Sequence, residues 1–237
     1  MSNFYCALQN HFFSIPVRDN KQRSILNPNF NNQEEKQPRR RTQAQNRAYR
    51  KKSLLTAAIV TVAKYDIAGA TVERICSQAG ASRGLIAHYF DSKEALLLAA
   101  LTNWFDLALS IKQQIAMDDQ LDAEAKIRRI AYSSFDNPSY SWETAAAWQA
   151  FTNASRHNKA YAKPIRNASQ FSNSVTEPLF REAAQNNKIK LDSKKAAVGL
   201  YILDDGLWNS LATGKDNLTI TQAKAYCDAY IDGCLNN

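Results

Sequence analysis

The chain has 237 residues, of which 45% are hydrophobic and only seven are glycine. It can therefore bury a sizeable core, and the scarcity of glycine argues against a turn-rich β-protein. The formal net charge of +8 is located in residues 38–93, which carry eleven Lys and Arg against three Asp and Glu. A basic segment beside a near-neutral remainder is typical of a module that binds a polyanion.

Residues 1–37 are rich in Asn and Gln and show no sustained period, so we expect a disordered extension. The apolar residues near its start are interrupted by Asn, Gln and His and follow no basic stretch, which makes a poor signal peptide. The run PRRRTQAQNRAYRKK (38–52) leads into the first helix. We interpret it as a flexible basic arm, and a solvated tail is the alternative.

A helical period begins at residue 46. The first helix is expected to end near Asp66, with Gly69 closing it. Thr71 is the predicted N-cap of a short second helix that stops at Gly80. The apolar stripes that support these two helices are Leu54, Leu55, Ala58, Ile59, Val62 and Ala63 in the first, and Val72, Ile75, Cys76 and Ala79 in the second.

The sequence Gly80-Ala81-Ser82-Arg83-Gly84 has the G-x-S-x-G pattern that presents a nucleophilic serine in many hydrolases. That geometry needs a strand entering the turn. Here the preceding TVERICSQA has helical spacing, and histidine and aspartate partners in a suitable context are missing. We therefore interpret Ser82 as the N-cap of a third helix, and keep a helical hydrolase using Ser82 only as an alternative.

Helix, tight turn and helix form a helix-turn-helix arrangement, whose second member enters the DNA major groove. On the third helix, Ile86 and Phe90 can face the core. Asp91 or Ser92 then caps a fourth helix, and Lys93 lies in its first turn, where the helix dipole disfavours a cation unless a phosphate binds there. The outward positions of the third helix are Arg83, Leu85, Ala87, His88 and Tyr89.

Residues 48–100 resemble the DNA-binding domain of the TetR family of one-component repressors. The small Ala87 in GLIAHYF, where the commonest pattern has an aromatic residue, resembles the BetI-like branch, which represses choline-to-glycine-betaine genes. The segments 145–161 and 203–214 also look like that branch. The residues that match the family signature in order and spacing are Thr71, Ile75, Ala79, Gly80, Ser82, Gly84, Ile86, His88, Tyr89, Phe90, Ser92, Lys93 and Leu96.

The resemblance implies an all-α homodimer, in which a three-helix helix-turn-helix domain precedes a larger helical ligand-binding and dimerisation domain. We place the basic arm and DNA-binding domain at residues 38–95 and the second domain at 96–237. Arg83 and Leu85 are expected to read bases. Arg47, Thr71, Ser82, His88, Tyr89 and Lys93 complete the expected DNA-binding set, mainly through phosphate contacts.

The second domain is expected to contain helices at about 104–118, 121–135, 141–157, 160–186, 192–213 and 218–234. A quaternary ammonium effector such as choline needs aromatic faces and a carboxylate. Trp148, Phe151 and Trp208 are the expected aromatics, with Asp204 as the carboxylate. The alternatives are a plain core role for the aromatics and solvation of both Asp204 and Asp205. The leucine stripe, Leu200, Leu203, Leu207 and Leu211, fits either a subunit interface or a core face.

The cysteines Cys6, Cys76, Cys227 and Cys234 have no metal-site spacing, so neither a disulfide framework nor a metal or other cofactor is expected. No apolar run approaches the roughly 20 residues that cross a bilayer. We therefore expect a cytoplasmic, non-enzymatic repressor that binds double-stranded operator DNA and has no membrane partner. An effector-independent, architectural DNA-binding protein is the remaining alternative.

Overall fold

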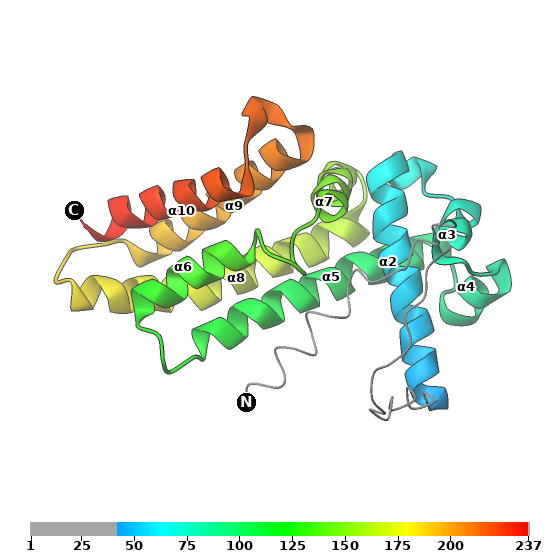
Figure 1. Cartoon of the computed structure of the whole chain (residues 1–237), viewed down its shortest axis with the longest axis horizontal. Helices are drawn as coiled ribbons and strands as arrows, with labels where there is room; N and C mark the ends of the chain where they lie inside the picture. The colour runs from blue at the N-terminus through cyan, green and yellow to red at the C-terminus, as the bar shows by residue number, and fades with distance from the viewer. Residues whose placement is uncertain (1–41, 237) are drawn as a thin grey trace, which may run out of the picture. The chain divides into compact units, whose positions relative to one another are not determined.

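A computed structural model of the chain describes residues 42–236, and the predicted extension and Arg39–Arg41 lie outside these residues. The chain divides into two units, with the boundary between Arg50 and Lys51. Every regular element of the described residues is a helix, which confirms the predicted all-α class (Figure 1).

Helix α2 (Gln43–Gly69) begins earlier than the sequence period suggested. Its start is a capping box, because Thr42 Oγ1 accepts from Gln45 N–H at 3.2 Å while Gln45 Oε1 accepts from Thr42 N–H at 2.8 Å. Residues 43–52 are therefore helical, and the expectation of a flexible arm there is wrong. The helix is interrupted at Asp66, whose φ of 61° is non-helical.

Two short helices follow, α3 (Val72–Ala79) and α4 (Arg83–Tyr89). The hydroxyl of Thr71 accepts from Arg74 N–H, and Gly80 ends α3 with a φ of 60°, a left-handed conformation that favours glycine. Both predicted caps are thus confirmed. The inner sides of these helices and of α2 bury Leu54, Ala58, Val62, Ile75, Ile86 and Phe90.

Helix α5 (Lys93–Ala116) is a single continuous element, so the predicted separate helix at 104–118 is wrong. By length and composition alone it is apolar enough to cross a membrane. Helix α5 nevertheless packs against α6 and α8, and its Leu97 and Leu101 are fully buried. The predicted domain boundary at residue 95 lies within this helix and stays a prediction.

The remaining helices agree with the predicted pattern to within a few residues. They are α6 (Ala123–Ser133), α7 (Trp142–Ser155), α8 (Lys159–Asn186), α9 (Ser193–Thr213) and α10 (Ile220–Leu235). Helix α8 packs against α5, α6, α7 and α9, and α10 lies along α6 and α9 (Figure 1).

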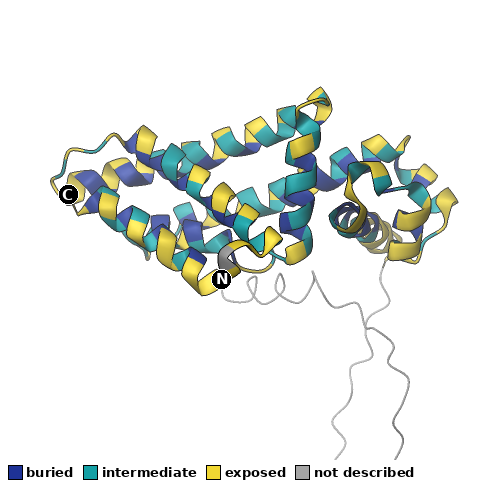
Figure 2. Ribbon diagram, turned by 90° about the horizontal axis from the view of Figure 1, so that it is seen from above, coloured by how far each residue is buried: buried dark blue, intermediate teal, exposed yellow. Residues whose placement is uncertain are grey.

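The leucine stripe of α9 faces the core, so the core alternative is the one that the structure shows. Leu200 and Leu207 are buried, and Leu203 and Leu211 pack against the same cluster. Buried and exposed residues alternate along the helices, so the helices have inward and outward sides (Figure 2). This stripe is therefore not an exposed subunit interface.

Helices α9 and α10 approach closely because residue 199 is glycine. A Cβ at Gly199 would lie 2.0 Å from the hydroxyl oxygen of Tyr230. That hydroxyl donates to the carbonyl oxygen of Ala196 at 3.0 Å. The missing side chain thus allows a tyrosine to bond directly to the neighbouring backbone.

Candidate functional site

Ser82 has a structural role in the turn between α3 and α4. Its Oγ accepts from Leu85 N–H at 3.2 Å, as an N-cap does. The element that enters the turn is helix α3, whereas a nucleophile elbow requires a strand. The G-x-S-x-G pattern is therefore a helix start, and the hydrolase alternative loses its geometric basis.

The outward face of α4 is narrower than the sequence suggested. Arg83, Ala87 and His88 are exposed, in agreement with the expectation. Leu85 and Tyr89 are half-buried and pack against the core cluster, so only part of each side chain faces outward. The ring of His88 stands edge-on to that of Tyr89 at a centroid distance of 5.0 Å.

Arg83 forms an ion pair with Glu73 of α3, with 2.6 Å between nitrogen and oxygen. The two side chains are 72% and 53% exposed. An exposed pair of this kind contributes little to stability, about 0–1 kcal/mol. Arg83 can therefore leave Glu73 for a stronger partner at small cost.

Lys93 is held differently from the prediction. Its ammonium donates to the carbonyl oxygen of Ile67 at 3.4 Å and lies 3.8 Å from Glu94. The side chain thus reaches the end of α2, and the cap of α5 is Ser92, which accepts from Ala95 N–H. The unfavourable position in the first turn is offset within the protein, so it gives no independent sign of a bound phosphate.

The other expected DNA-binding residues fall into two groups. Arg47 lies on α2 in the first compact unit and is exposed. Thr71 is half-buried, and its hydroxyl is already used as the cap of α3.

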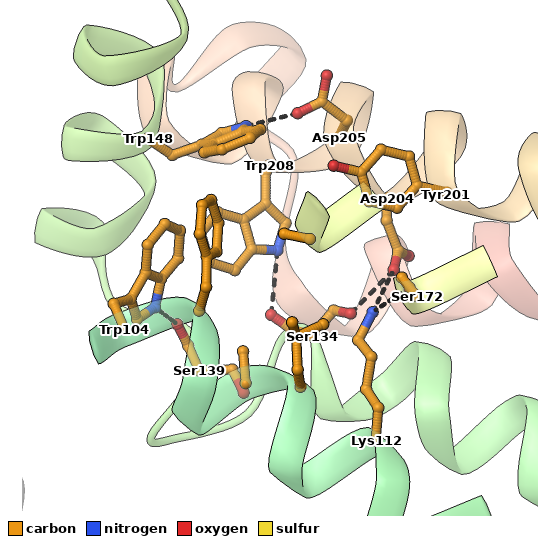
Figure 3. A pocket seen from close by; sticks show the side chains of 14 residues that line it. Trp104, Lys112, Ser134, Ser139, Trp148, Ser172, Tyr201, Asp204, Asp205 and Trp208 are labelled. Atoms are coloured by element: carbon orange, nitrogen blue, oxygen red, sulfur yellow. Dashed lines mark hydrogen bonds and ion pairs between the residues drawn. The ribbon is translucent and has the colours of Figure 1, made fainter. Parts of the chain in front are cut away.

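A cavity of about 90 Å³ lies between α5, α7, α8 and α9 (Figure 3). An engineered cavity of about 150 Å³ holds benzene, so this one suits a ligand with few heavy atoms. Its lining is formed by Trp104, Phe105, Ala108, Leu109 and Lys112 of α5, Ser134 and Ser139 after α6, Trp148 of α7, Ala168 and Ser172 of α8, and Tyr201, Asp204, Asp205 and Trp208 of α9.

One end of the cavity is aromatic. The ring of Trp104 lies 5.4 Å from that of Trp208 and 6.1 Å from that of Trp148, centroid to centroid. Each indole nitrogen is fixed, since Trp104 donates to Ser139 O, Trp208 to Ser134 O and Trp148 to Asp205 Oδ1. This end therefore gathers three oriented indoles and the exposed carboxylate of Asp205, and aromatic rings with a negative charge are the groups that suit an organic cation.

The other end is polar and buried. The ammonium of Lys112 lies 3.3 Å from Ser172 Oγ and 3.8 Å from Asp204 Oδ2. Asp204 also accepts from Ser134 Oγ–H at 2.8 Å and from the Cys227 thiol at 3.6 Å. Burial raises the pKa of Asp204 above its ordinary value, although Lys112 and the hydrogen bonds from Ser134 and Cys227 act against this.

Three of the four predicted ligand residues line this cavity: Trp148, Asp204 and Trp208. The fourth, Phe151, lies outside the lining. Its side chain is fully buried and its ring packs against Tyr161 at 5.2 Å, so the core alternative holds for it. Asp204 is buried, and the solvated alternative is wrong for this residue.

The contribution of α5 to the cavity was not predicted from the sequence. Trp104, Ala108 and Lys112 recur every four residues and so share one helix face. The signal was present within the predicted helix at 104–118, but the predicted ligand residues came only from the segments 145–161 and 203–214, which resemble the BetI-like branch. Among residues 42–236, no group of three His, Cys, Asp or Glu side chains is placed to hold a metal ion.

Comparison with known proteins gives two family matches. Residues 54–100 match the "Bacterial regulatory proteins, tetR family", and residues 123–236 match the "BetI-type transcriptional repressor, C-terminal" family. The chain is 30% identical to the HTH-type transcriptional regulator BetI of Proteus mirabilis over 79% of this chain and 92% of that one. It is 31% identical to BetI 2 of Chromohalobacter salexigens, over 79% and 89%.

Two solved structures have similar folds. A transcriptional regulator from Pseudomonas aeruginosa PAO1 superposes with a TM-score of 0.69 at 25% identity, covering 80% of this chain and 92% of that one. A regulator from Saccharomonospora viridis, solved in complex with choline, also gives 0.69 at 20% identity, covering 78% and 96%. At 20% identity, the similarity to the Saccharomonospora viridis structure shows only that the two proteins share a fold.

Proposed function

The chain belongs to the TetR family of DNA-binding transcription regulators, with a C-terminal part of the BetI type, and we propose that it is a homodimeric repressor released from a palindromic operator by a small effector. The observation that carries the DNA-binding half is the exposed edge of α4, where Arg83, Ala87 and His88 face outward. The family is one of regulators rather than enzymes, and the proposed location is the cytoplasm.

In this proposal Arg83 exchanges its exposed Glu73 partner for a base edge, because a guanidinium can bond bidentately to guanine. The exposed part of Leu85 contacts a thymine methyl group. Phosphate contacts come from Arg47, Thr71, His88, Tyr89 and Lys93, and Ser82 keeps the start of α4 in place.

A homodimer places two α4 helices in successive major grooves, roughly 34–36 Å apart. The leucine stripe is unavailable for subunit pairing because it lies in the core. Large exposed apolar side chains elsewhere on α9 and α10 support a pairing surface there, namely Ile202 at 63% and Tyr226 at 56% exposure. Burial of such side chains is a usual source of stability in homodimers.

The proposed effector is choline or a related quaternary ammonium compound. The three indoles, with Asp205 beside them, support this class of ligand, and a regulator of the same fold has been solved with choline. Helix α5 begins directly after α4 and carries Trp104 and Lys112 in the cavity lining. A ligand that favours one position of α5 would favour one spacing of the two α4 helices, which is the differential affinity that a switch requires.

Replacing Arg83 with Ala is expected to weaken binding to an operator selected from random DNA by about 1–3 kcal/mol and to relax its sequence preference. Lys93→Ala is expected to weaken all sequences alike and to reduce the salt slope by about one. Fluorescence anisotropy at several salt concentrations measures both.

A half-site should bind more weakly than the palindrome, because only one subunit then has a specific site.

The assignment of base reading to Arg83 fails if Arg83→Ala leaves affinity and preference unchanged. Glu73→Gln serves as the matched control, because it frees the same guanidinium without removing it. Equal affinity for the half-site and the palindrome would argue against a dimeric reader.

Choline at millimolar concentration is expected to release the protein from its operator. Trp208→Phe should weaken choline binding by at most about 2 kcal/mol, the upper value for one cation–π contact, since the benzene ring retains a smaller π-face. Trp142→Phe is the control, because Trp142 is exposed and lies outside the cavity lining. Calorimetry that shows no choline binding to folded protein would reject this effector class while leaving the DNA-binding proposal intact. If no small molecule alters DNA binding, the effector-independent alternative gains support.

A further inference from the structure

We propose that the buried Lys112–Asp204 pair recognises the oxygen end of the effector and selects a neutral hydroxyl over a carboxylate. This inference rests on the proposed function, in which the aromatic end of the cavity holds a quaternary ammonium group. It adds a specificity determinant at the opposite, polar end, where Figure 3 shows Lys112, Ser134, Ser172 and Asp204 gathered together.

Lys112 has donor capacity to spare. An ammonium group has three N–H donors. Within the described part of the chain, its one hydrogen bond is to Ser172 Oγ at 3.3 Å, and the nearer oxygen of Asp204 is 3.8 Å away. The side chain is only 11% exposed, so water reaches the ammonium poorly. A ligand oxygen beside Lys112 would receive a charge-assisted hydrogen bond.

Asp204 has acceptor capacity to spare on the same side of the cavity. Oδ2 accepts from Ser134 Oγ–H at 2.8 Å, while Oδ1 has the weak thiol donor of Cys227 at 3.6 Å. A carboxylate has about four acceptor positions. Lys112 and Asp204 therefore present a donor and an acceptor together, which is the complement of a hydroxyl group that both accepts and donates.

A carboxylate ligand fits this end less well. It accepts from Lys112 but has no proton to donate to Asp204, and it places a second negative charge beside a buried one. Like charges repel strongly where water is excluded. While Asp204 is ionised, its charge balances that of Lys112, so a neutral oxygen group adds no uncompensated charge whereas a carboxylate does.

The small volume of the cavity strengthens this selection. A space of about 90 Å³ leaves little room for a ligand to keep its cation among the indoles while turning its oxygen end away from Lys112. A compact cation that carries an oxygen group is therefore the ligand class that fits a cavity with these two ends.

Four small molecules test the proposal on the unaltered protein by titration calorimetry. Choline has both groups, ethyltrimethylammonium lacks the oxygen, trimethylglycine has a carboxylate, and 3,3-dimethylbutan-1-ol lacks the charge. Choline is expected to bind about tenfold to a hundredfold more tightly than ethyltrimethylammonium, the factor that corresponds to a hydrogen bond to a charged group. Trimethylglycine is expected to bind more weakly than choline by at least a similar factor.

The outcomes separate this inference from the proposed function. If choline and ethyltrimethylammonium bind equally, or if trimethylglycine binds as well as choline, the role of the pair is overturned and the quaternary ammonium proposal stands. If neither cation binds to folded protein, or if the uncharged alcohol binds as tightly as choline, the effector class fails and this inference fails with it.

Asp204→Asn provides a second test, because it should change the affinities for choline and trimethylglycine in opposite directions. Removing the negative charge should weaken choline most, weaken ethyltrimethylammonium less because only charge attraction is lost, and strengthen trimethylglycine. Loss of packing alone would weaken all three. Asp205→Asn is the matched control, because it is expected to weaken every cationic ligand alike. Parallel losses for all three ligands in folded Asp204→Asn would overturn the proposal.

Discussion

Replacing Phe151 with Ala is expected to lower the free energy of unfolding by about 3–5 kcal/mol, the usual cost of removing a buried aromatic ring. The side chain is fully buried and packs edge-on against Tyr161 at 5.2 Å. Since Phe151 does not line the cavity, protein that remains folded should bind choline with unchanged affinity. Urea denaturation followed by circular dichroism measures the first effect and calorimetry the second.

Phe151→Leu is the control for this prediction. It fills most of the space and should cost clearly less than the alanine substitution. A weakened choline affinity in folded Phe151→Leu would show that the ring acts on the ligand after all. A cost below about 1 kcal/mol for Phe151→Ala would contradict its place in a tightly packed core.

The helix-turn-helix segment was predictable from the sequence because its signals are local. Thr71, Ser82 and Ser92 each bond to an N–H three residues ahead, and Gly80 supplies the left-handed turn. Such caps depend on nearby backbone geometry alone. The resemblance of residues 48–100 to a known family rests on the same local signals.

The cavity was only partly predictable because it depends on which helix faces meet. Trp148 and Phe151 are three residues apart on α7, yet one lines the cavity and the other fills the core. Periodicity indicates a shared face but not the neighbour that covers it. The leucine stripe was ambiguous for the same reason.

The long-range polar contacts could not be predicted from the sequence for a further reason. Lys112 and Asp204 are far apart in the sequence, and neither residue alone signals a buried pair. The position of Lys93 in the first turn of α5 appeared unfavourable, because its hydrogen-bond partner is not on α5. That partner, the carbonyl oxygen of Ile67, belongs to α2 and lies 26 residues earlier in the sequence. Tertiary contacts decide both cases.

Asp204→Ala is expected to lower the free energy of unfolding by about 3–5 kcal/mol, because it leaves Lys112 buried without its counter-charge. Lys112→Met leaves Asp204 with Ser134 and Cys227 as its hydrogen-bond donors, and it should also destabilise the protein. The double variant Lys112→Met with Asp204→Ala removes both charges together.

The double variant should therefore cost less than the sum of the two single variants, by about 0.5–3 kcal/mol. Urea denaturation of the four proteins gives this coupling energy directly. The separation of 3.8 Å between Lys112 Nζ and Asp204 Oδ2 makes the test a strict one, since a pair at that distance has no short hydrogen bond to add to its Coulomb attraction. Additive costs would mean that the two charges are stabilised independently, Asp204 by Ser134 and Lys112 by Ser172. Coupled costs would mean that the fold maintains the charge pair as a unit.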